Sequence, residues 1–176
     1  MSPMQEDPTL ASWRGLGETL EGSFAARARG LLASEFAILG REGEEIGRLE
    51  IHGAEGAELE VGDLEALIEH STLSGYTMFT DGAEILTAEP RRAWYAPEIK
   101  CLDRLYQGRL SLLRNTARAG PPGEMATVRI TGALTNRNYE AVFDTDDERS
   151  LPVAFFLLYL TVALRRKAYL TGTKRS

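Results

Sequence analysis

The chain has 176 residues, of which 20 are lysine or arginine and 26 are aspartate or glutamate, so that its net charge is −6. With 43% hydrophobic residues, a chain of this length can bury a core as one domain, which excludes disorder as its dominant state. A single cysteine excludes an intramolecular disulfide, and Met1–Leu10 lacks the basic and apolar stretches of a secretion signal, so we expect a cytoplasmic protein.

The charges are distributed unevenly along the chain. Eleven acidic and two basic residues lie between Glu35 and Glu69, so this stretch repels polyanions. The isoelectric point of the whole chain is about 5.1. The last 12 residues instead contain five bases and no acid. Such a tail can hold an anionic surface, although bases near a helix C-terminus also complement the helix dipole. The low isoelectric point and the lack of a continuous basic stripe argue against nucleic acid as a partner.

No linker composition divides the chain, so we predict one domain at residues 13–170, with a flexible N-terminus at 1–12 and a basic C-terminal tail at 171–176. Gly15-Leu16-Gly17 begins like a dinucleotide-binding loop, but the third glycine is missing and no strong strand precedes it. We interpret it as a flexible turn.

Alternation of apolar and polar residues with a period of two predicts β-structure with one buried face through the middle of the chain. Phe24–Leu32 alternates loosely, and Ala57–Val61 alternates strictly. Three hairpins are predicted, namely Phe36–Leu39 with Glu45–Ile51, Tyr76–Thr80 with Ala83–Thr87, and Ala126–Thr131 with Tyr139–Phe143. Asp81-Gly82 joins the second pair and favours a type I′ turn, in which both central residues take positive φ.

Two segments fit both a helix and a strand. Asp63–His70 has Leu64, Leu67 and Ile68 at helical spacing but is as short as a strand. Ile99–Leu113 has a similar spacing until Gly108 interrupts it. We predict β-structure for both segments.

The segment Leu151–Leu164 contains no charged residue. Acidic residues and Ser150 precede it, Pro152 lies in its first turn, and Arg165-Arg166-Lys167 follows it, which are the usual signals of a helix start and a helix end. Large apolar side chains cover all its faces, so it lies either in a protein core or in a membrane. Its length of about 21 Å is short of the roughly 30 Å of bilayer hydrocarbon, which favours the protein core.

A β-rich domain that ends in one fully apolar helix can bury that helix by closing its sheet around it, which also removes the sheet edges. We therefore predict a mainly β protein, an antiparallel β-barrel wrapped around a hydrophobic C-terminal helix. An open sheet with the helix on one face fits the same pattern, but it leaves one side of the helix exposed.

The sequence also resembles a known family. The succession Glu35–Leu39, Gly47–Leu49, Tyr76–Phe79, Tyr139–Phe143 and Leu151–Leu158 resembles the tubby C-terminal-like superfamily over residues 13–169, and is most similar to its LURP-one-related and phospholipid-scramblase-like branches. Members are β-barrels wound around a hydrophobic C-terminal helix. The resemblance implies a binding or membrane-associated scaffold rather than an enzyme, since tubby binds phosphoinositide head groups and scramblase-like proteins are linked to lipids. The basic lipid-binding residues of tubby have no matching motif in this sequence.

Motifs of catalysis are absent from the sequence, which has no Gly-x-Ser-x-Gly elbow, no phosphate-binding loop and no His-Glu-x-x-His helix. His52 and His70 are the only histidines, and a zinc site would have to recruit carboxylates such as Glu50 or Glu69. Cys101 lies near two bases but has no histidine partner, which favours a structural thiol. We predict no catalytic residue, no metal site and no cofactor.

Two sets of residues remain as candidate sites. Arg27 and Arg29 share one face of a predicted strand, and Arg91 and Arg92 lie next to Trp94 and Tyr95, so both arginine pairs are candidates for binding an anion or a lipid head group. The acidic run Asp144–Glu148 offers oxygen ligands for calcium but lacks the glycine and the distant glutamate of an EF-hand. Its position before a helix explains it without a metal.

The sequence thus predicts a non-enzymatic β-barrel scaffold that binds a lipid, a small ligand or a protein partner through its loops and rim. The alternative is a peripheral or tail-anchored membrane protein, in which residues 151–164 insert into the bilayer and the basic C-terminus holds the head groups.

Overall fold

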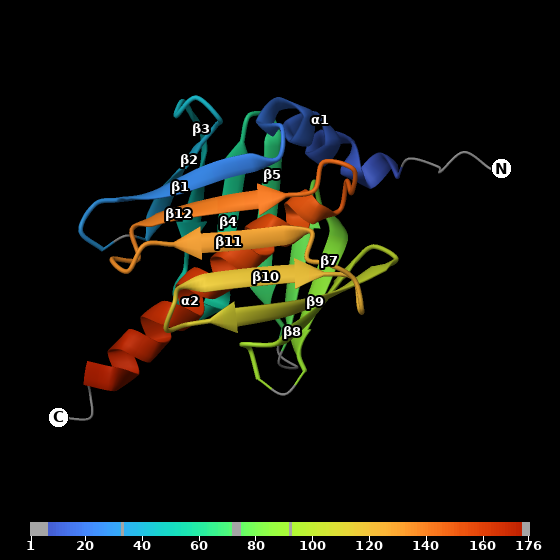
Figure 1. Ribbon diagram of the computed structural model, residues 1–176. Helices are drawn as coiled ribbons and strands as arrows, with labels where there is room; N and C mark the ends of the chain where they lie inside the picture. Colours follow the sequence, from blue (N-terminus) through green and yellow to red (C-terminus); the bar gives the residue numbers. More distant parts are fainter. Residues whose placement is uncertain (1–6, 33, 72–74, 92, 174–176) are drawn as a thin grey trace.

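The computed structural model describes residues 7–32, 34–71, 75–91 and 93–173, with side chains as far as Lys167 (Figure 1). Its strands are β1 Ser23–Arg29, β2 Glu35–Leu39, β3 Glu45–Ile51, β4 Gly56–Val61, β5 Leu64–His70, β6 Tyr76–Thr80, β7 Ala83–Pro90, β8 Pro97–Cys101, β9 Arg104–Ser111, β10 Thr116–Gly120, β11 Val128–Gly132 and β12 Asn138–Phe143. Two helices, α1 Ala11–Leu20 and α2 Ser150–Thr173, and two single 3₁₀ turns, η1 Pro8–Leu10 and η2 Gly53–Glu55, complete the described elements.

The twelve strands form one closed barrel. Each strand pairs antiparallel with its neighbours in sequence, and β1 closes the sheet by pairing with β12. Such closure leaves no strand edge open to pair with another chain. The predicted fold class, a mainly β antiparallel barrel with a C-terminal helix, is therefore confirmed.

The predicted hairpins are present as β2–β3, β6–β7 and β11–β12. Asp81 and Gly82 have φ values of 51° and 79°, so both central residues of the β6–β7 turn take the positive φ that a type I′ turn requires. Of the two ambiguous segments, Asp63–His70 contains β5, and Ile99–Leu113 is divided between β8 and β9 by a turn at Leu102. The prediction of β-structure is confirmed for both.

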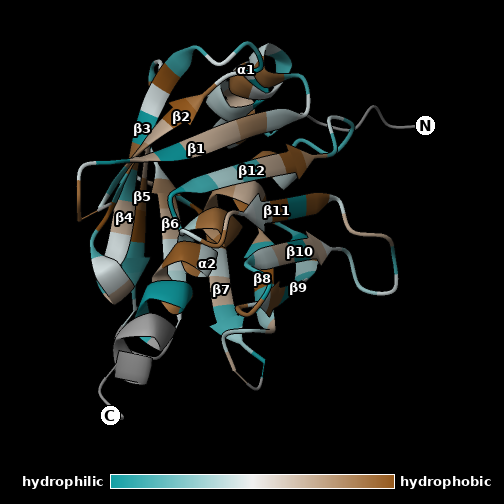
Figure 2. Cartoon of the chain, turned by 60° about the vertical axis from the view of Figure 1, so that its left-hand side comes forward, coloured by the Kyte–Doolittle hydropathy of each residue, from teal (hydrophilic) through white to brown (hydrophobic). Residues whose placement is uncertain are grey.

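Helix α2 runs through the barrel and forms the centre of its core (Figures 1 and 2). Every residue from Leu151 to Val162 is buried, whereas Ala163 to Arg166 are only half-buried. The buried part is about 18 Å long, which matches strands of five to eight residues. Because the barrel covers all faces of residues 151–162, this part of the segment lies in the protein core, as the length argument predicts.

The helix is longer than the predicted Leu151–Leu164. It continues to Thr173, so residues 171–173 of the predicted basic tail continue its backbone, and residues 174–176 lie outside the described residues. The polar hydroxyl of Thr161 is buried in the core and donates to the carbonyl oxygen of Leu157 at 2.7 Å. This bond satisfies the hydroxyl inside the apolar core.

Helix α1 is an element that the sequence analysis missed. It lies at the end of the barrel where α2 begins, and Leu10, Trp13 and Leu20 are buried there (Figure 1). The interpretation of residues 15–17 as a flexible turn is wrong, because they lie within this helix. The assignment of 1–12 to a flexible N-terminus is wrong for residues 8–12, which belong to η1 and α1, while residues 1–6 lie outside the described residues.

Two tyrosines attach the opposite end of the barrel to the core. The Tyr159 hydroxyl on α2 donates to the carbonyl oxygen of Gly53 at 2.8 Å, and the Tyr76 hydroxyl on β6 donates to that of Ala54 at 2.9 Å. Both acceptors lie in η2, between β3 and β4. The central helix therefore fixes the conformation of a loop at the end from which it emerges.

Candidate functional site

Because α2 occupies the interior, the surfaces open to a ligand are the outer wall and the two ends of the barrel. Of the predicted anion-binding residues, Arg29 forms an ion pair with Glu45, whereas the exposed Arg27 side chain has no partner among the described residues. Arg91 follows β7 and lines a hollow together with arginines of β9, β10 and β11. Arg92 lies outside the described residues. The three predicted arginines that the structure describes therefore do not form one site.

The end of the barrel from which α2 emerges, here called the exit end, is formed by the loops β1–β2, β3–β4, β5–β6, β7–β8, β9–β10 and β11–β12. The guanidinium of Arg165 on α2 lies at this end and contacts two of these loops. Its Nη1 donates to the carbonyl oxygen of Leu112, its Nε donates to the side chain of Asn136, and its Nη2 donates to the carbonyl oxygen of Leu134 at 3.4 Å. The helix is thereby joined to the β9–β10 and β11–β12 loops.

Exposed apolar side chains gather at the exit end. Among the described residues, seven large hydrophobic side chains are exposed, and five of them lie in these loops, namely Leu31, Leu32, Tyr95, Leu113 and Leu134. The four leucines are 75% to 100% exposed. They lie in the turns of β1–β2, β9–β10 and β11–β12, three hairpins that follow one another around the wall, and these turns point to the same side in Figure 1.

The same three turns carry positive charge. Their sequences, residues 30–34, 112–115 and 133–137, contain Arg114 and Arg137 and no acidic residue. Arg137 donates to the carbonyl oxygen of Gly30 at 2.9 Å, which joins two leucine-bearing turns. The emerging part of α2 adds Arg165, Arg166 and Lys167. The side of the exit end formed by these three turns thus combines exposed leucines with the exposed Arg114 and Lys167, and with the half-buried Arg137, Arg165 and Arg166.

A second basic feature lies on the outer wall. Arg118 on β10 is directly opposite Arg109 on β9 and Arg129 on β11, so that three exposed arginines form a row across three neighbouring strands. None of the three guanidinium groups has a carboxylate or another acceptor within bonding distance among the described residues. The sequence analysis did not identify this row.

The opposite wall, over β2 to β5, is acidic. Arg48 on β3 balances part of this charge, because it pairs with Glu60 at 3.1 Å and with Glu35 at 3.6 Å. The two carboxylates raise the pKa of the Arg48 guanidinium, mainly through the hydrogen bond with Glu60. The walls of the barrel therefore carry charge of opposite sign.

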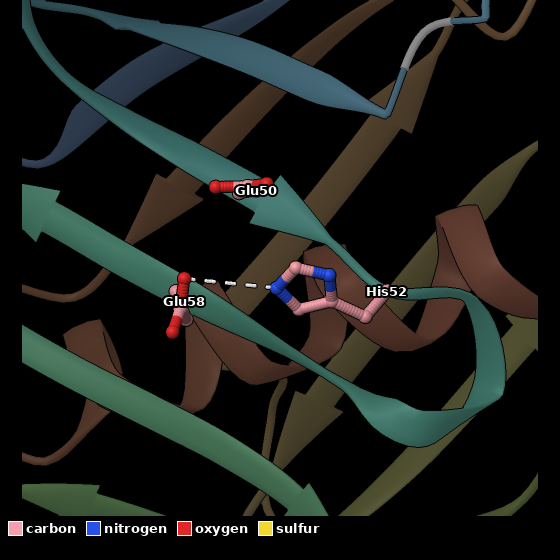
Figure 3. Close-up of side chains that lie close together, drawn as sticks. All are labelled: Glu50, His52 and Glu58. Atoms are coloured by element: carbon pink, nitrogen blue, oxygen red, sulfur yellow. Dashed lines mark ion pairs between the residues drawn. The ribbon is translucent and has the colours of Figure 1, made fainter.

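At the exit end of this acidic wall, Glu50, His52 and Glu58 lie close together (Figure 3). One ligand atom from each lies within 4.8 Å of the other two, and His52 Nε2 lies 3.6 Å from Glu58 Oε2. An imidazole and two carboxylates are a donor set that suits zinc, so these residues could hold a divalent cation. The structure thus brings Glu50 to His52, while His70 contacts the ring of Tyr76 instead, with the ring centroids 5.0 Å apart.

The acidic run Asp144–Glu148 surrounds the start of α2. Asp147 is buried, where it accepts a hydrogen bond from the Tyr106 hydroxyl, and Glu148 pairs with Arg14 on α1 at 2.9 Å. Burial and the bond to Asp147 raise the pKa of the Tyr106 phenol. These carboxylates are thus engaged in attaching α1 and β9 to the helix start.

Cys101 at the end of β8 is fully buried, and this burial raises the pKa of its thiol to about 12. Because the thiolate is the reactive form, we expect the native protein to resist alkylation by iodoacetamide at pH 8 and the protein unfolded in urea to be labelled at once. Mass spectrometry measures the labelled fraction. The protonated thiol contributes stability below its ordinary pKa of 9.0, and that contribution is lost as the pH rises toward 12. Rapid labelling of the native protein would contradict the buried position.

None of the described helices combines the length and the apolar content that crossing a lipid bilayer takes.

No model of a protein family matches the sequence, and no curated protein is significantly similar to it. Among solved structures, the fold is similar to that of a protein from Arabidopsis thaliana, AT5G01750, whose X-ray structure superimposes with a TM-score of 0.54 at 10% sequence identity. The similar region covers 84% of this chain and 93% of the Arabidopsis chain. At this identity the similarity shows a shared fold and nothing about activity.

Proposed function

We propose that this protein is a non-enzymatic β-barrel scaffold that docks on anionic phospholipid membranes with its exit end. One observation carries the proposal, namely that five of the seven exposed large hydrophobic side chains of the described chain lie at this end. Apolar side chains concentrated on one surface mark an interaction site, whereas scattered ones need no explanation.

The chemistry of the exit end fits a lipid surface. Leucines at turn tips can enter the boundary between head groups and acyl chains, where each fully buried side chain contributes about 1.5–3 kcal/mol. The exposed Arg114 and Lys167 beside them can contact anionic head groups, at roughly 1 kcal/mol each near the surface. Because both contributions arise at the same end, one orientation of the barrel satisfies them together.

The resemblance to the tubby C-terminal-like superfamily supports the same proposal. A barrel around a central helix is the architecture that this resemblance implies, and its phospholipid-scramblase-like branch is linked to lipids. We place the protein at the cytoplasmic face of a membrane, where anionic lipids are concentrated. The basic C-terminus takes part, as in the sequence-based alternative, but the apolar segment of α2 stays inside the barrel.

Vesicle flotation tests the proposal. We expect the protein to float with vesicles that contain about 30% phosphatidylserine in low salt, and to float less as added salt screens the charges. With vesicles of pure phosphatidylcholine, it should remain unbound at the bottom of the gradient. Replacing Leu31, Leu32, Leu113 and Leu134 by serine should reduce the bound fraction at least about tenfold, because the charges alone then hold the protein.

The matched control is Met125→Ser, which removes an exposed apolar side chain from the opposite end of the barrel. We expect this variant to float like the wild type. All the replaced side chains are exposed, so circular dichroism should show an unchanged fold. Absence of wild-type flotation in low salt, or equal flotation of the four-leucine variant, would refute docking through the exit end.

A further inference from the structure

The row formed by Arg109, Arg118 and Arg129, here called the arginine row, has no explanation in membrane docking, because it lies on the side wall of the barrel. Residues directly opposite on neighbouring antiparallel strands have Cβ atoms about 4.5–5.5 Å apart, and like charges at this distance destabilise the sheet. The described structure provides no carboxylate that pairs with any of the three. Three adjacent positive charges are therefore held together without compensation.

A row of hydroxyl groups runs beside the arginine row. Thr116 on β10 is directly opposite Ser111 on β9 and Thr131 on β11. These three residues are two positions from the arginines along each strand, so they face the same outer side of the sheet, about 7 Å away. Hydroxyl and guanidinium groups are both hydrogen-bond donors. Both rows line one hollow on the wall.

A second hollow lies on the other side of the arginine row. The same three arginines line it, together with Arg91, one of the anion-binding candidates that the sequence predicts. Glu124 is the single carboxylate among the described residues that line either hollow, and it forms no ion pair there. The arginine row is thus accessible from both sides.

Acidic residues lie on both sides of the area formed by the arginine row and the hydroxyl row. Glu98 on β8 is opposite Gln107, and Glu140 on β12 is opposite Thr131, so both border the donors without pairing with the arginines. The donors span three strands, a width of about 10 Å. A compact anion with several charges fits this area, whereas an extended polyanion would also meet Glu98 and Glu140.

We propose that the arginine row and the hydroxyl row form a binding site for a compact ligand that carries two or more phosphate groups. Planar guanidinium groups bind phosphate oxygens through paired charge-assisted hydrogen bonds, and the ligand relieves the repulsion within the row. The phosphates can belong to a soluble small molecule or to a lipid head group. Neither row contains a residue of the proposed docking surface, although Arg114 of the β9–β10 turn also lines the hollow shared by the two rows.

Calorimetric titration with inorganic tripolyphosphate in low-salt buffer tests the site in the full-length protein. We expect micromolar affinity, a loss of at least about tenfold in Arg118→Gln, and a smaller loss in Arg118→Lys, which keeps the charge but not the planar fork. Arg27→Gln is the matched control, since Arg27 is also an exposed strand arginine without a side-chain partner among the described residues. It should bind like the wild type.

A second measurement needs no ligand. Because Arg118 is repelled by an arginine on each side, Arg118→Gln should raise Tm by about 1–3 °C in low salt, and added salt should reduce this difference. Millimolar or weaker binding by the wild type, or an equal loss of affinity in Arg27→Gln, would overturn the proposal.

Flotation distinguishes the two sources of phosphate and separates this proposal from membrane docking. If Arg118→Gln weakens binding to vesicles containing a polyphosphorylated lipid as much as it weakens tripolyphosphate binding, the ligand is a head group. If it weakens tripolyphosphate binding alone, the ligand is soluble. The four-leucine variant should bind tripolyphosphate like the wild type, so failure of either proposal can be observed separately.

Discussion

Replacing Phe155 by alanine should lower the free energy of unfolding by about 3–5 kcal/mol, the usual cost of removing a buried phenylalanine side chain. Phe155 lies on the first turns of α2 and is fully buried. Its ring stacks on that of Phe24 in β1, with centroids 4.2 Å apart and an angle of 13° between the planes, and it contacts Trp13 at 5.9 Å. Strands surround this part of the helix, so the cavity has little room to collapse.

Urea unfolding followed by fluorescence measures the loss, with Phe79→Ala as the control. Phe79 is half-buried on β6 and faces the outer side of the wall, where it lines a shallow hollow. We expect its truncation to cost about 1 kcal/mol or less, because solvent replaces the removed side chain. Equal losses for the two phenylalanines would contradict a central position of α2 in the core.

Trp13→Ala should also lower the free energy of unfolding by about 3–5 kcal/mol, although Trp13 lies close to the N-terminus. Its side chain is 1% exposed, and its indole N–H donates to the Thr80 hydroxyl at 2.9 Å. Trp13→Phe keeps most of the apolar contact and removes this hydrogen bond. We expect it to lower the free energy of unfolding by less than the alanine variant does, and the lost hydrogen bond accounts for about 1 kcal/mol of its effect. The exposed Glu18 on the same helix provides a control, since Glu18→Ala should stay within about 0.5 kcal/mol.

The two aromatic residues also test whether α1 and α2 belong to one cooperative core. Because Trp13 and Phe155 are in contact, their truncations should not be additive, and a double-mutant cycle should give a coupling energy of about 0.5–1.5 kcal/mol. Denaturation curves of the four proteins supply the cycle. Additive losses, or a separate early transition for α1, would contradict the packing of this helix on the barrel core.

Local residue patterns were sufficient for most of the barrel. In β4, Leu59 and Val61 face inward while Glu58 and Glu60 face solvent, as their alternation predicts. For α2, length and all-round hydrophobicity predicted a core helix, since a segment so short and bounded by Arg165 cannot span a bilayer. Closure of the sheet was expected for the same reason, because an apolar helix needs cover on every face.

Helix α1 could not be predicted in the same way. Gly15 and Gly17 lower the intrinsic helix propensity of a ten-residue segment, and the segment has no acidic residue in its first turn and no basic residue in its last turn. Its helical form depends on tertiary contacts instead, above all the burial of Trp13 and Leu20 against the barrel. A local pattern carries little information about such contacts.

The candidate sites depended still more on tertiary structure. The alternation in β9, β10 and β11 already predicts that each strand turns its arginine toward one face, but only the register places Arg118 opposite Arg109 and Arg129. Likewise, Leu31, Leu113 and Leu134 lie far apart in the chain and meet at one end because their hairpins are neighbours in the closed barrel. A signal was present in the sequence, namely leucines inside turn segments that contain no acid.

By itself, the sequence determined the period of the strands, the position of the turns and the helix around which the barrel closes, since these follow from the local succession of apolar and polar residues. The tertiary structure alone decided which charges and exposed leucines lie together. Hydrogen-bond register and barrel closure set those distances, and they join residues as far apart in the chain as Ser23 and Val142, beyond the reach of any local pattern.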